Sequence, residues 1–355
     1  MGIALLYGLA GGFLGSFIFV FLGITLTDIG IGYLWVVAII GLLINFRFIC
    51  FSYAGGIVSL SSIILGWPQV NVPSIIALVG VMHLLESILI RINGDDKPVP
   101  IIARHQEYGV IGGYIMQKLW PLPFVAMLAF SMTEVQGSAI DMPEWWPLID
   151  TIIEVAPGEE LVYFVFPVIA GLGYGDLSLA HTPEKRVKIT SKKLFLYSLV
   201  LILLAVGSVY FSDLLLLAAL ASPVGHEIVI KKGRKEEKDN PPALKKPDQG
   251  ILVLGVYPDY PADSFGLKRG DIITEVDNIE IDNVQQFYDL VEEKEEFKVN
   301  RKDKNPIHFK KGSNNSLGLF FLDEKKAVEM DEIFGRKGII QKYYHKLSQK
   351  LFGTS

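Results

Sequence analysis

The sequence predicts an α-helical transmembrane bundle of six to eight spans, followed by a small soluble α+β domain. Three observations support this division. Residues 1–181 contain 18 of the 71 charged residues, and residues 182–355 contain the other 53. Long apolar stretches fill the first part, where a bilayer core requires about 20 apolar residues per helix. After residue 230 the pattern changes to a charged segment and then to short runs typical of strands and turns.

Composition excludes several classes of protein. Cys50 is the only cysteine, so neither a disulfide scaffold nor a multi-cysteine zinc module is expected. A formal net charge of −5 argues against nucleic-acid binding. No cofactor is expected from any motif in the chain.

Eight apolar stretches are predicted to be membrane spans. They cover residues 3–25, 29–45, 48–66, 72–91, 119–136, 160–179, 194–211 and 213–229. The last contains Pro223 and His226, so it can also be half-buried or re-entrant. A count of six spans instead of eight would leave both ends of the chain on the same sides of the membrane.

Charged loops predict the orientation in the membrane, because basic loops stay on the cytoplasmic side. Residues 182–193 contain five Lys or Arg, and residues 231–235 contain four. Residues 134–160 contain seven Asp or Glu and no Lys or Arg. The acidic segment is therefore expected outside and both termini in the cytoplasm.

Small residues recur on one of the predicted helices. Gly8 and Gly12, like Gly11 and Gly15, are four residues apart, a spacing that allows close helix packing in lipid. Packing within the bundle is favoured over homodimerisation.

Two ionisable residues lie within the span 72–91. His83 and Glu86 are three residues apart and so share a helix face, and ionisable groups at membrane depth are costly. Two interpretations remain open, a pair satisfied by a neighbouring helix and a functional pair. No metal is expected, since no further His or Cys cluster is evident at membrane depth.

The predicted domains are a transmembrane domain at 1–230, a charged linker at 231–249, a soluble domain at 250–322 and a basic amphipathic helix at 323–355. In the soluble domain we expect strands at 250–257, 272–276, 296–301, 306–310 and 317–322, with helices at 262–267 and 282–293. The final helix would suit either an anionic membrane surface or the body of the soluble domain. Its apolar face consists of Ile339, Ile340, Tyr343, Tyr344, Leu347 and Leu351.

The soluble segment resembles a bacterial PDZ domain. The residues that carry the resemblance are Pro261-Ala262, Gly266-Leu267, Gly270-Asp271-Ile272-Ile273 and Val276-Asp277-Asn278. The carboxylate-binding loop that PDZ domains usually place before the first strand is missing from 240–249. Residues 306–322 look like the missing strand, loop and strand, so we expect a circularly permuted PDZ domain.

The resemblance implies that an extended peptide or protein C-terminus binds by strand addition. The expected carboxylate loop and binding strand comprise Ser316, Leu317, Gly318, Leu319 and Phe320. Gln286 and Leu290 are expected in the opposite wall, and Lys310 or Lys311 would add positive potential. The alternative is that this strand is only a core strand and the groove is vestigial.

Catalysis is not expected. A site-2 metalloprotease needs His-Glu-x-x-His, in which two histidines bind zinc and Glu acts as a base. His226-Glu227 is followed by Ile230 where the second His would stand, and His83 is followed by Leu84.

Residues 46–94 and 111–128, followed by the PDZ-like segment, resemble the MinJ family of Gram-positive bacteria. That resemblance implies a multi-pass, non-enzymatic adaptor that links a DivIVA-like coiled-coil protein to a MinD-like ATPase at septum and poles. The alternatives are a septal scaffold for protein secretion and, less favoured, a relative of the intramembrane proteases.

Overall fold

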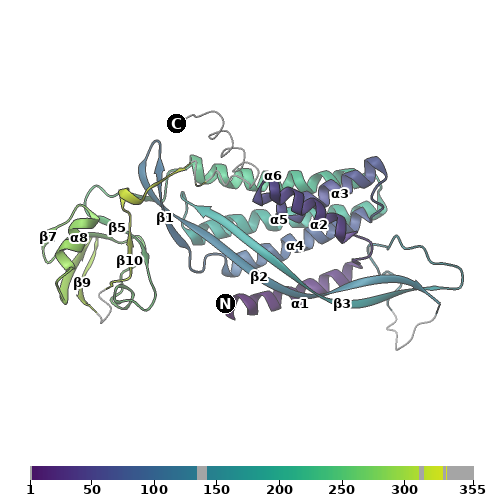
Figure 1. Cartoon of the computed structure of the whole chain (residues 1–355), viewed down its shortest axis with the longest axis horizontal. Coiled ribbons are helices and arrows are strands. Elements are labelled where there is room, and N and C mark those ends of the chain that lie inside the picture. The colour runs from purple at the N-terminus through teal and green to yellow at the C-terminus, as the bar shows by residue number, and fades with distance from the viewer. Residues whose placement is uncertain (1, 134–141, 312–315, 331–332, 334–355) are drawn as a thin grey trace, which may run out of the picture.

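The computed structural model describes residues 2–133, 142–311, 316–330 and 333 (Figure 1). Four helices are long and apolar enough to cross a membrane: α1 (Gly2–Leu22), α4 (Val72–Asn93), α5 (Pro183–Tyr210) and α6 (Leu214–Asp239). A rise of about 1.5 Å per residue makes each long enough for a hydrocarbon core of roughly 30 Å. These helices correspond to the predicted spans 3–25, 72–91, 194–211 and 213–229.

Two shorter helices replace the predicted spans 29–45 and 48–66. Helices α2 (Ile31–Ile44) and α3 (Phe51–Leu65) have 14 and 15 residues and are joined by the 3₁₀ turn η1 (Phe46–Ile49). Both are shorter than a typical spanning helix. The six to eight spans of the sequence analysis therefore reduce to four helices of spanning length in the described chain.

The predicted spans 119–136 and 160–179 are not helical over the residues that the structure describes. They form β2 (Gly109–Met132) and β3 (Glu160–Ser178), which pair antiparallel from Tyr114↔Ser178 to Met132↔Glu160. Hydropathy alone could not separate the two structures, because a long apolar strand and an apolar helix have similar composition. Prolines at 121, 123 and 167 disfavour a helix, and the aromatic and β-branched residues from 162 to 166 favour a strand.

Helix α1 packs along β2 through its small residues. A Cβ atom added at Gly8 or at Gly12 would lie 2.0 Å from the carbonyl oxygen of Pro121 or Pro123, respectively. One turn further, the Val125 N–H donates to Ser16 Oγ at 2.8 Å. The glycine pattern thus serves packing within the chain: Gly8 and Gly12 face the backbone of β2, whereas Gly11 and Gly15 face Leu89 and Leu85 of helix α4.

Gly12→Ala should destabilise the protein, because the new methyl group would force α1 away from the backbone of β2. We expect a loss of about 1–3 kcal/mol, the usual cost of overpacking, measured by thermal unfolding in detergent. Gly32→Ala in α2 is the control, since no atom lies within 4 Å of its added Cβ. Equal melting temperatures for the two variants would contradict this packing.

The C-terminal domain is a small sheet with one main helix. Its strands follow the order β10-β5-β6-β8-β9, with β7 beside β6. These elements are β5 (Ile251–Val256), α7 (Pro261–Ser264), β6 (Ile272–Val276), β7 (Ile279–Glu280), α8 (Val284–Val291), β8 (Glu296–Arg301), β9 (Lys304–Lys310) and β10 (Leu319–Phe321). Its buried core includes Val253, Ile273, Phe287, Val299 and Phe321. The expected strands and helices all appear, with ends shifted by a few residues.

The expected linker 231–249 is largely ordered. Helix α6 continues to Asp239, and β4 (Leu244–Lys245) then pairs with β2. The charged run extends the helix because Lys and Glu are good helix formers, and it ends just before Pro241 and Pro242. The C-terminal domain is therefore connected to the bundle by defined structure (Figure 1).

A second sheet joins the two parts of the protein. Strand β1 (Val99–His105) pairs antiparallel with β2 and parallel with β11 (Val328–Glu329). The Tyr114 hydroxyl donates to the Leu254 carbonyl at 2.8 Å. An apolar cluster of Ile102, Val110, Leu252, Leu254 and Leu322 fills the junction. The predicted C-terminal helix 323–355 does not begin as an α-helix. Its first residues form the 3₁₀ turn η2 (Glu324–Lys326) and the strand β11 instead. Residues 334–355 lie outside the described chain.

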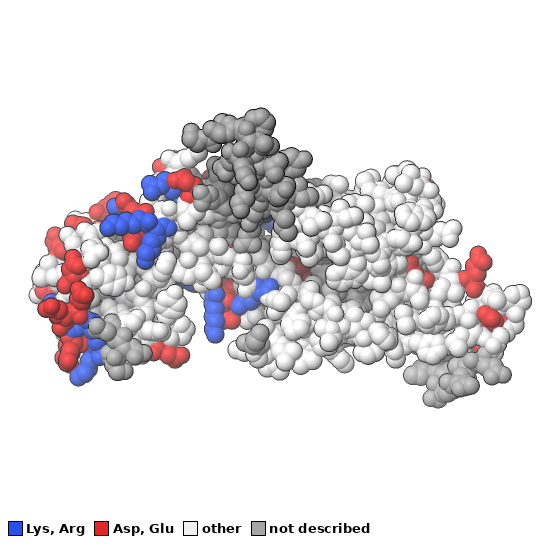
Figure 2. Space-filling view, in the orientation of Figure 1, with Lys and Arg blue, Asp and Glu red and all other residues white. Residues whose placement is uncertain are grey.

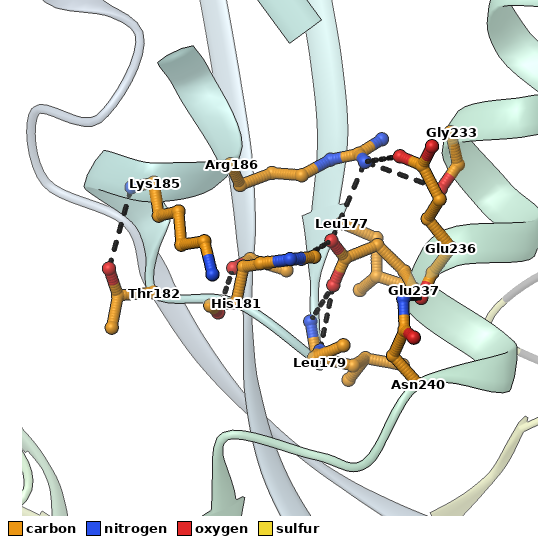
Figure 3. A network of polar contacts seen from close by, with 12 residues as sticks. Leu177, Leu179, His181, Thr182, Lys185, Arg186, Gly233, Glu236, Glu237 and Asn240 are labelled. Atoms are coloured by element: carbon orange, nitrogen blue, oxygen red, sulfur yellow. Dashed lines mark hydrogen bonds and ion pairs between the residues drawn. The ribbon is translucent and has the colours of Figure 1, made fainter. Parts of the chain in front are cut away.

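A buried ion network fastens the junction to α5 and α6 (Figure 3). Arg186 donates from Nε and Nη2 to the two carboxylate oxygens of Asp176, at 2.8 Å each, and from Nη1 to the Gly233 carbonyl at 3.2 Å. Glu237 Oε2 accepts the N–H groups of Leu179 and Ala180 at 2.7 Å each. The network thus holds the end of β3 against both helices.

Candidate functional site

A groove of about 440 Å³ separates β10 from α8 in the C-terminal domain. One side is formed by the loop before β10 and the start of that strand, and the other by α8. Its lining residues are Gln285, Tyr288, Asp289, Val291, Glu292, Lys311, Ser316, Leu317, Gly318 and Leu319. Four of the five residues expected in the loop and strand are among them.

Strand β10 presents an edge to this groove. It pairs antiparallel with β5 through Leu319↔Val256 and Phe320↔Gly255, and it ends the order of strands in the described sheet. An edge strand offers backbone N–H and C=O groups to an added strand. The edge can therefore accept an extended peptide by strand addition.

The loop before β10 turns backbone N–H groups toward the open edge. The Gly318 carbonyl accepts from the Tyr257 N–H at 2.8 Å, and the Leu317 carbonyl accepts from the Ala262 N–H at 3.1 Å. A trans peptide bond points its N–H away from its C=O, so the N–H groups of Gly318 and Leu319 face away from β5 and α7. Two such neighbouring N–H groups suit a carboxylate.

Gly318 is required for this loop conformation. Its φ of +74° lies in the left-handed region, and an added Cβ would lie 2.2 Å from Tyr260 Cβ. Glycine has no Cβ and adopts this region without strain.

The wall opposite the loop differs from the expected one by one residue in helical register. Gln285 and Asp289 line the groove instead of Gln286 and Leu290. Gln286 accepts the Asp282 N–H at 2.9 Å, and Leu290 packs against the domain core. The shift arises because Asn283, rather than Asp282, caps α8: its Oδ1 accepts the Gln286 N–H at 2.9 Å.

Two other expected residues have distinct positions. Phe320 does not line the groove but packs against the junction cluster, as alternation along a strand requires. Lys311 lines the groove, and its Nζ donates to the Glu292 carbonyl at 2.6 Å. Lys310 instead pairs with Glu296 at 2.9 Å, which raises the pKa of its ammonium group.

Asp271 anchors the turn that leads into β6. Its buried carboxylate accepts from Lys304 Nζ at 2.5 Å, Arg301 Nη1 at 3.0 Å and the Lys268 N–H at 3.0 Å. Burial acts to raise the pKa of Asp271, but these donors together hold it below its usual value. The carboxylate thus stabilises the fold of the domain in its charged form.

Acid should weaken the domain through Asp271. A carboxyl whose pKa is lower in the folded than in the unfolded chain stabilises the fold above about pH 4 and loses that contribution as pH falls through the folded pKa. Asp271→Asn should therefore lower stability at pH 7 by about 2 kcal/mol and reduce the acid sensitivity. Thermal unfolding from pH 3 to 7 tests this, with exposed Asp282→Asn as the control. An unchanged pH profile in Asp271→Asn would contradict the assignment.

The membrane pair His83 and Glu86 lies in a larger polar cluster. His83 Nε2 is 3.9 Å from Glu86 Oε2 but only 3.3 Å from Cys50 Sγ. His226 Nε2 lies 3.6 Å from the same sulfur. The expectation of no metal assumed that no other His or Cys lies near, and this premise is wrong. Sequence reasoning missed the cluster because its members come from three segments far apart in the chain.

Comparison with known proteins agrees with this architecture. Residues 252–302 match the PDZ domain family. The chain is 25% identical over 221 residues to the cell division topological determinant MinJ of Bacillus subtilis (strain 168), which covers 62% of this chain and 52% of the relative. The chain thus spans about half the length of that relative. No solved structure matches the chain. The chain is therefore similar to MinJ over part of its length and carries a PDZ domain at residues 252–302.

Proposed function

We propose that this protein is a non-enzymatic membrane adaptor, whose PDZ groove captures an extended peptide or C-terminus of a partner at the division site. The observation that carries the proposal is a groove with an open strand edge, in a domain fastened to an apolar helical bundle. PDZ domains bind proteins rather than transform substrates, and they do so by strand addition. An adaptor needs both properties, a membrane anchor and a peptide-binding surface.

The bound peptide would add to β10 as a further strand. Its terminal carboxylate would lie at the N–H groups of Gly318 and Leu319, with Ser316 at the entrance. Its side chains would contact Tyr288 and Gln285 on α8, and Lys311 would provide the positive charge nearest the carboxylate. The acidic Asp289 and Glu292 on the same wall would favour basic or polar side chains upstream of the terminus.

The PDZ domain is proposed to be circularly permuted. Strand β10, which borders the groove, follows β9 at the end of the domain and pairs back onto β5. The carboxylate loop consequently comes from residues 316–319, close to the segment that returns to the junction sheet as β11.

Partners and location are proposed from the similarity to MinJ. A cell division topological determinant acts where the septum forms, so we place this protein at septum and poles. There it would recruit a DivIVA-like coiled-coil protein and a MinD-like ATPase through its transmembrane region and PDZ domain. No enzymatic step is required of it.

The charge distribution supports a cytoplasmic PDZ domain. Figure 2 shows Lys, Arg, Asp and Glu gathered at the PDZ end, an almost uncharged bundle, and acidic residues at the opposite end. Basic residues remain on the cytoplasmic side of a membrane. We therefore propose that the junction sheet and both termini face the cytoplasm.

Membrane sidedness can be measured with single cysteines in a Cys50→Ser background. A membrane-impermeant maleimide applied to intact protoplasts should label a cysteine placed at Glu154 and not one at Lys302. Permeabilised protoplasts should label both, which controls for accessibility. Labelling of position 302 in intact protoplasts would refute the cytoplasmic location.

Localisation in dividing cells tests the adaptor. A fluorescent protein fused to the C-terminus should concentrate at septa and poles, and deletion should misplace septa. Uniform membrane fluorescence together with normal septum placement after deletion would refute the division-site role.

Partner capture tests the groove. Gly318→Ala should reduce recovery of the MinD-like or DivIVA-like partner from detergent-solubilised membranes at least tenfold, because the methyl group distorts the carboxylate loop. Gly266→Ala is the matched control: Gly266 also has a positive φ (+83°), but no atom lies within 4 Å of its added Cβ. Equal recovery with both variants would mean that this loop does not bind the partner.

A further inference from the structure

We propose that Cys50, His83 and His226 bind one zinc-type divalent cation inside the helical bundle. Cys50 precedes α3 as its N-cap, His83 lies in α4, and His226 lies in α6. Their ligand atoms all lie within 4.8 Å of one another. The site is independent of the PDZ groove and of the adaptor function proposed above.

The distances between ligand atoms fit tetrahedral coordination. Cys50 Sγ lies 3.3 Å from His83 Nε2 and 3.6 Å from His226 Nε2. Zinc–sulfur and zinc–nitrogen bonds of about 2.3 and 2.05 Å place the sulfur and nitrogen of a tetrahedral site about 3.6 Å apart. The described positions therefore leave room for the ion with only small movements of the side chains.

The hydrogen bonds of His83 prepare it as a ligand. Its Nδ1 lies 2.8 Å from the Val79 carbonyl, an acceptor, so Nδ1 carries the proton and Nε2 presents a lone pair. This lone pair points at the sulfur of Cys50. Zinc-binding histidines commonly have such a carbonyl partner on the other ring nitrogen, because it fixes the tautomer and ring orientation.

The neighbouring hydroxyls do not satisfy the His83 lone pair. The Tyr197 hydroxyl donates to the Ser222 carbonyl at 2.6 Å, so its contact with Ser52 Oγ at 2.9 Å requires Ser52 as the donor. Ser52 then has no proton for His83 Nε2, although the atoms are 3.2 Å apart. The thiol of Cys50 is the remaining donor.

One thiol proton cannot serve both imidazoles. If Cys50 donates to His83, then His226 must carry its proton on Nε2 to reach the sulfur. Its Nδ1 then has a buried lone pair without a hydrogen-bond partner in the described chain. A bound cation replaces these shared protons at the sulfur, because the thiolate and both Nε2 lone pairs then point at one positive charge.

Charge balance also favours a divalent cation. With an ion bound, a thiolate at Cys50 and a carboxylate at Glu86, whose Oε2 is 3.9 Å from His83 Nε2, would together carry two negative charges. Two uncompensated charges among apolar helices would be costly, and one divalent ion neutralises them. Glu86 thereby acquires a role, either as the fourth ligand or as a partner of a bound water.

Zinc loading of the purified full-length protein in detergent tests the site. After chelation and exposure to Zn²⁺, we expect about one zinc per chain by elemental analysis. Zinc should also slow maleimide labelling of Cys50 at least tenfold, and this readout is specific because Cys50 is the only cysteine. Co²⁺ should produce a thiolate-to-cobalt charge-transfer absorption in the near ultraviolet.

Variants separate this site from incidental metal binding. Cys50→Ser and His226→Gln should lose the zinc, and Cys50→Ser should abolish the charge-transfer absorption. His308→Gln, an exposed histidine on β9, should retain both. If Zn²⁺ does not slow the maleimide labelling of Cys50 in the wild-type protein, the proposal is wrong. This measurement does not depend on the folding of any variant. Retention of one zinc per chain in Cys50→Ser would overturn it equally.

Discussion

The arrangement of the two halves depends on the buried guanidinium of Arg186. Its five donors would be costly to bury alone, and the structure supplies Asp176, Glu237 and the Gly233 carbonyl as acceptors. These partners belong to β3 and α6, whereas Arg186 belongs to α5. Removal of one partner from such a network typically costs about 3–5 kcal/mol, because a charge remains buried without compensation. The ion network therefore fixes where the helices meet the junction sheet.

That fixed junction determines how the PDZ groove is presented. The Tyr114 hydroxyl bonds to the domain backbone, and Arg269 lies over the Tyr114 ring and pairs with Glu184 at the start of α5. Two short strands, β4 and β11, bring the chain into the junction sheet on either side of the domain. A partner captured at the groove would thus be held in a defined direction relative to the bundle, rather than on a freely moving tether.

The β2–β3 hairpin is the unusual component of the apolar region. Backbone polar groups away from water must find partners, which usually restricts membrane-embedded structure to helices and closed barrels. Here β3 satisfies one edge of β2, and α1 covers part of the other through Ser16 and glycines that approach carbonyl oxygens. Prolines at 121 and 123 have no backbone N–H, so fewer donors on that edge of β2 need a hydrogen-bond partner. Small residues on α1 are therefore needed for the hairpin and not only for contact between helices.

The sequence by itself determined the division into an apolar bundle and a soluble domain, since charge and hydropathy change sharply along the chain. It also determined most elements of the PDZ domain, because turn glycines and short apolar runs are local signals. Only the tertiary structure decided that the predicted spans 119–136 and 160–179 contain the paired strands β2 and β3, because hydropathy alone does not distinguish an apolar strand from an apolar helix. Helical register on α8 likewise depended on which residue caps it. The meeting of Cys50, His83 and His226 had no local signal at all, since three separate segments must fold together before their side chains share one point in space.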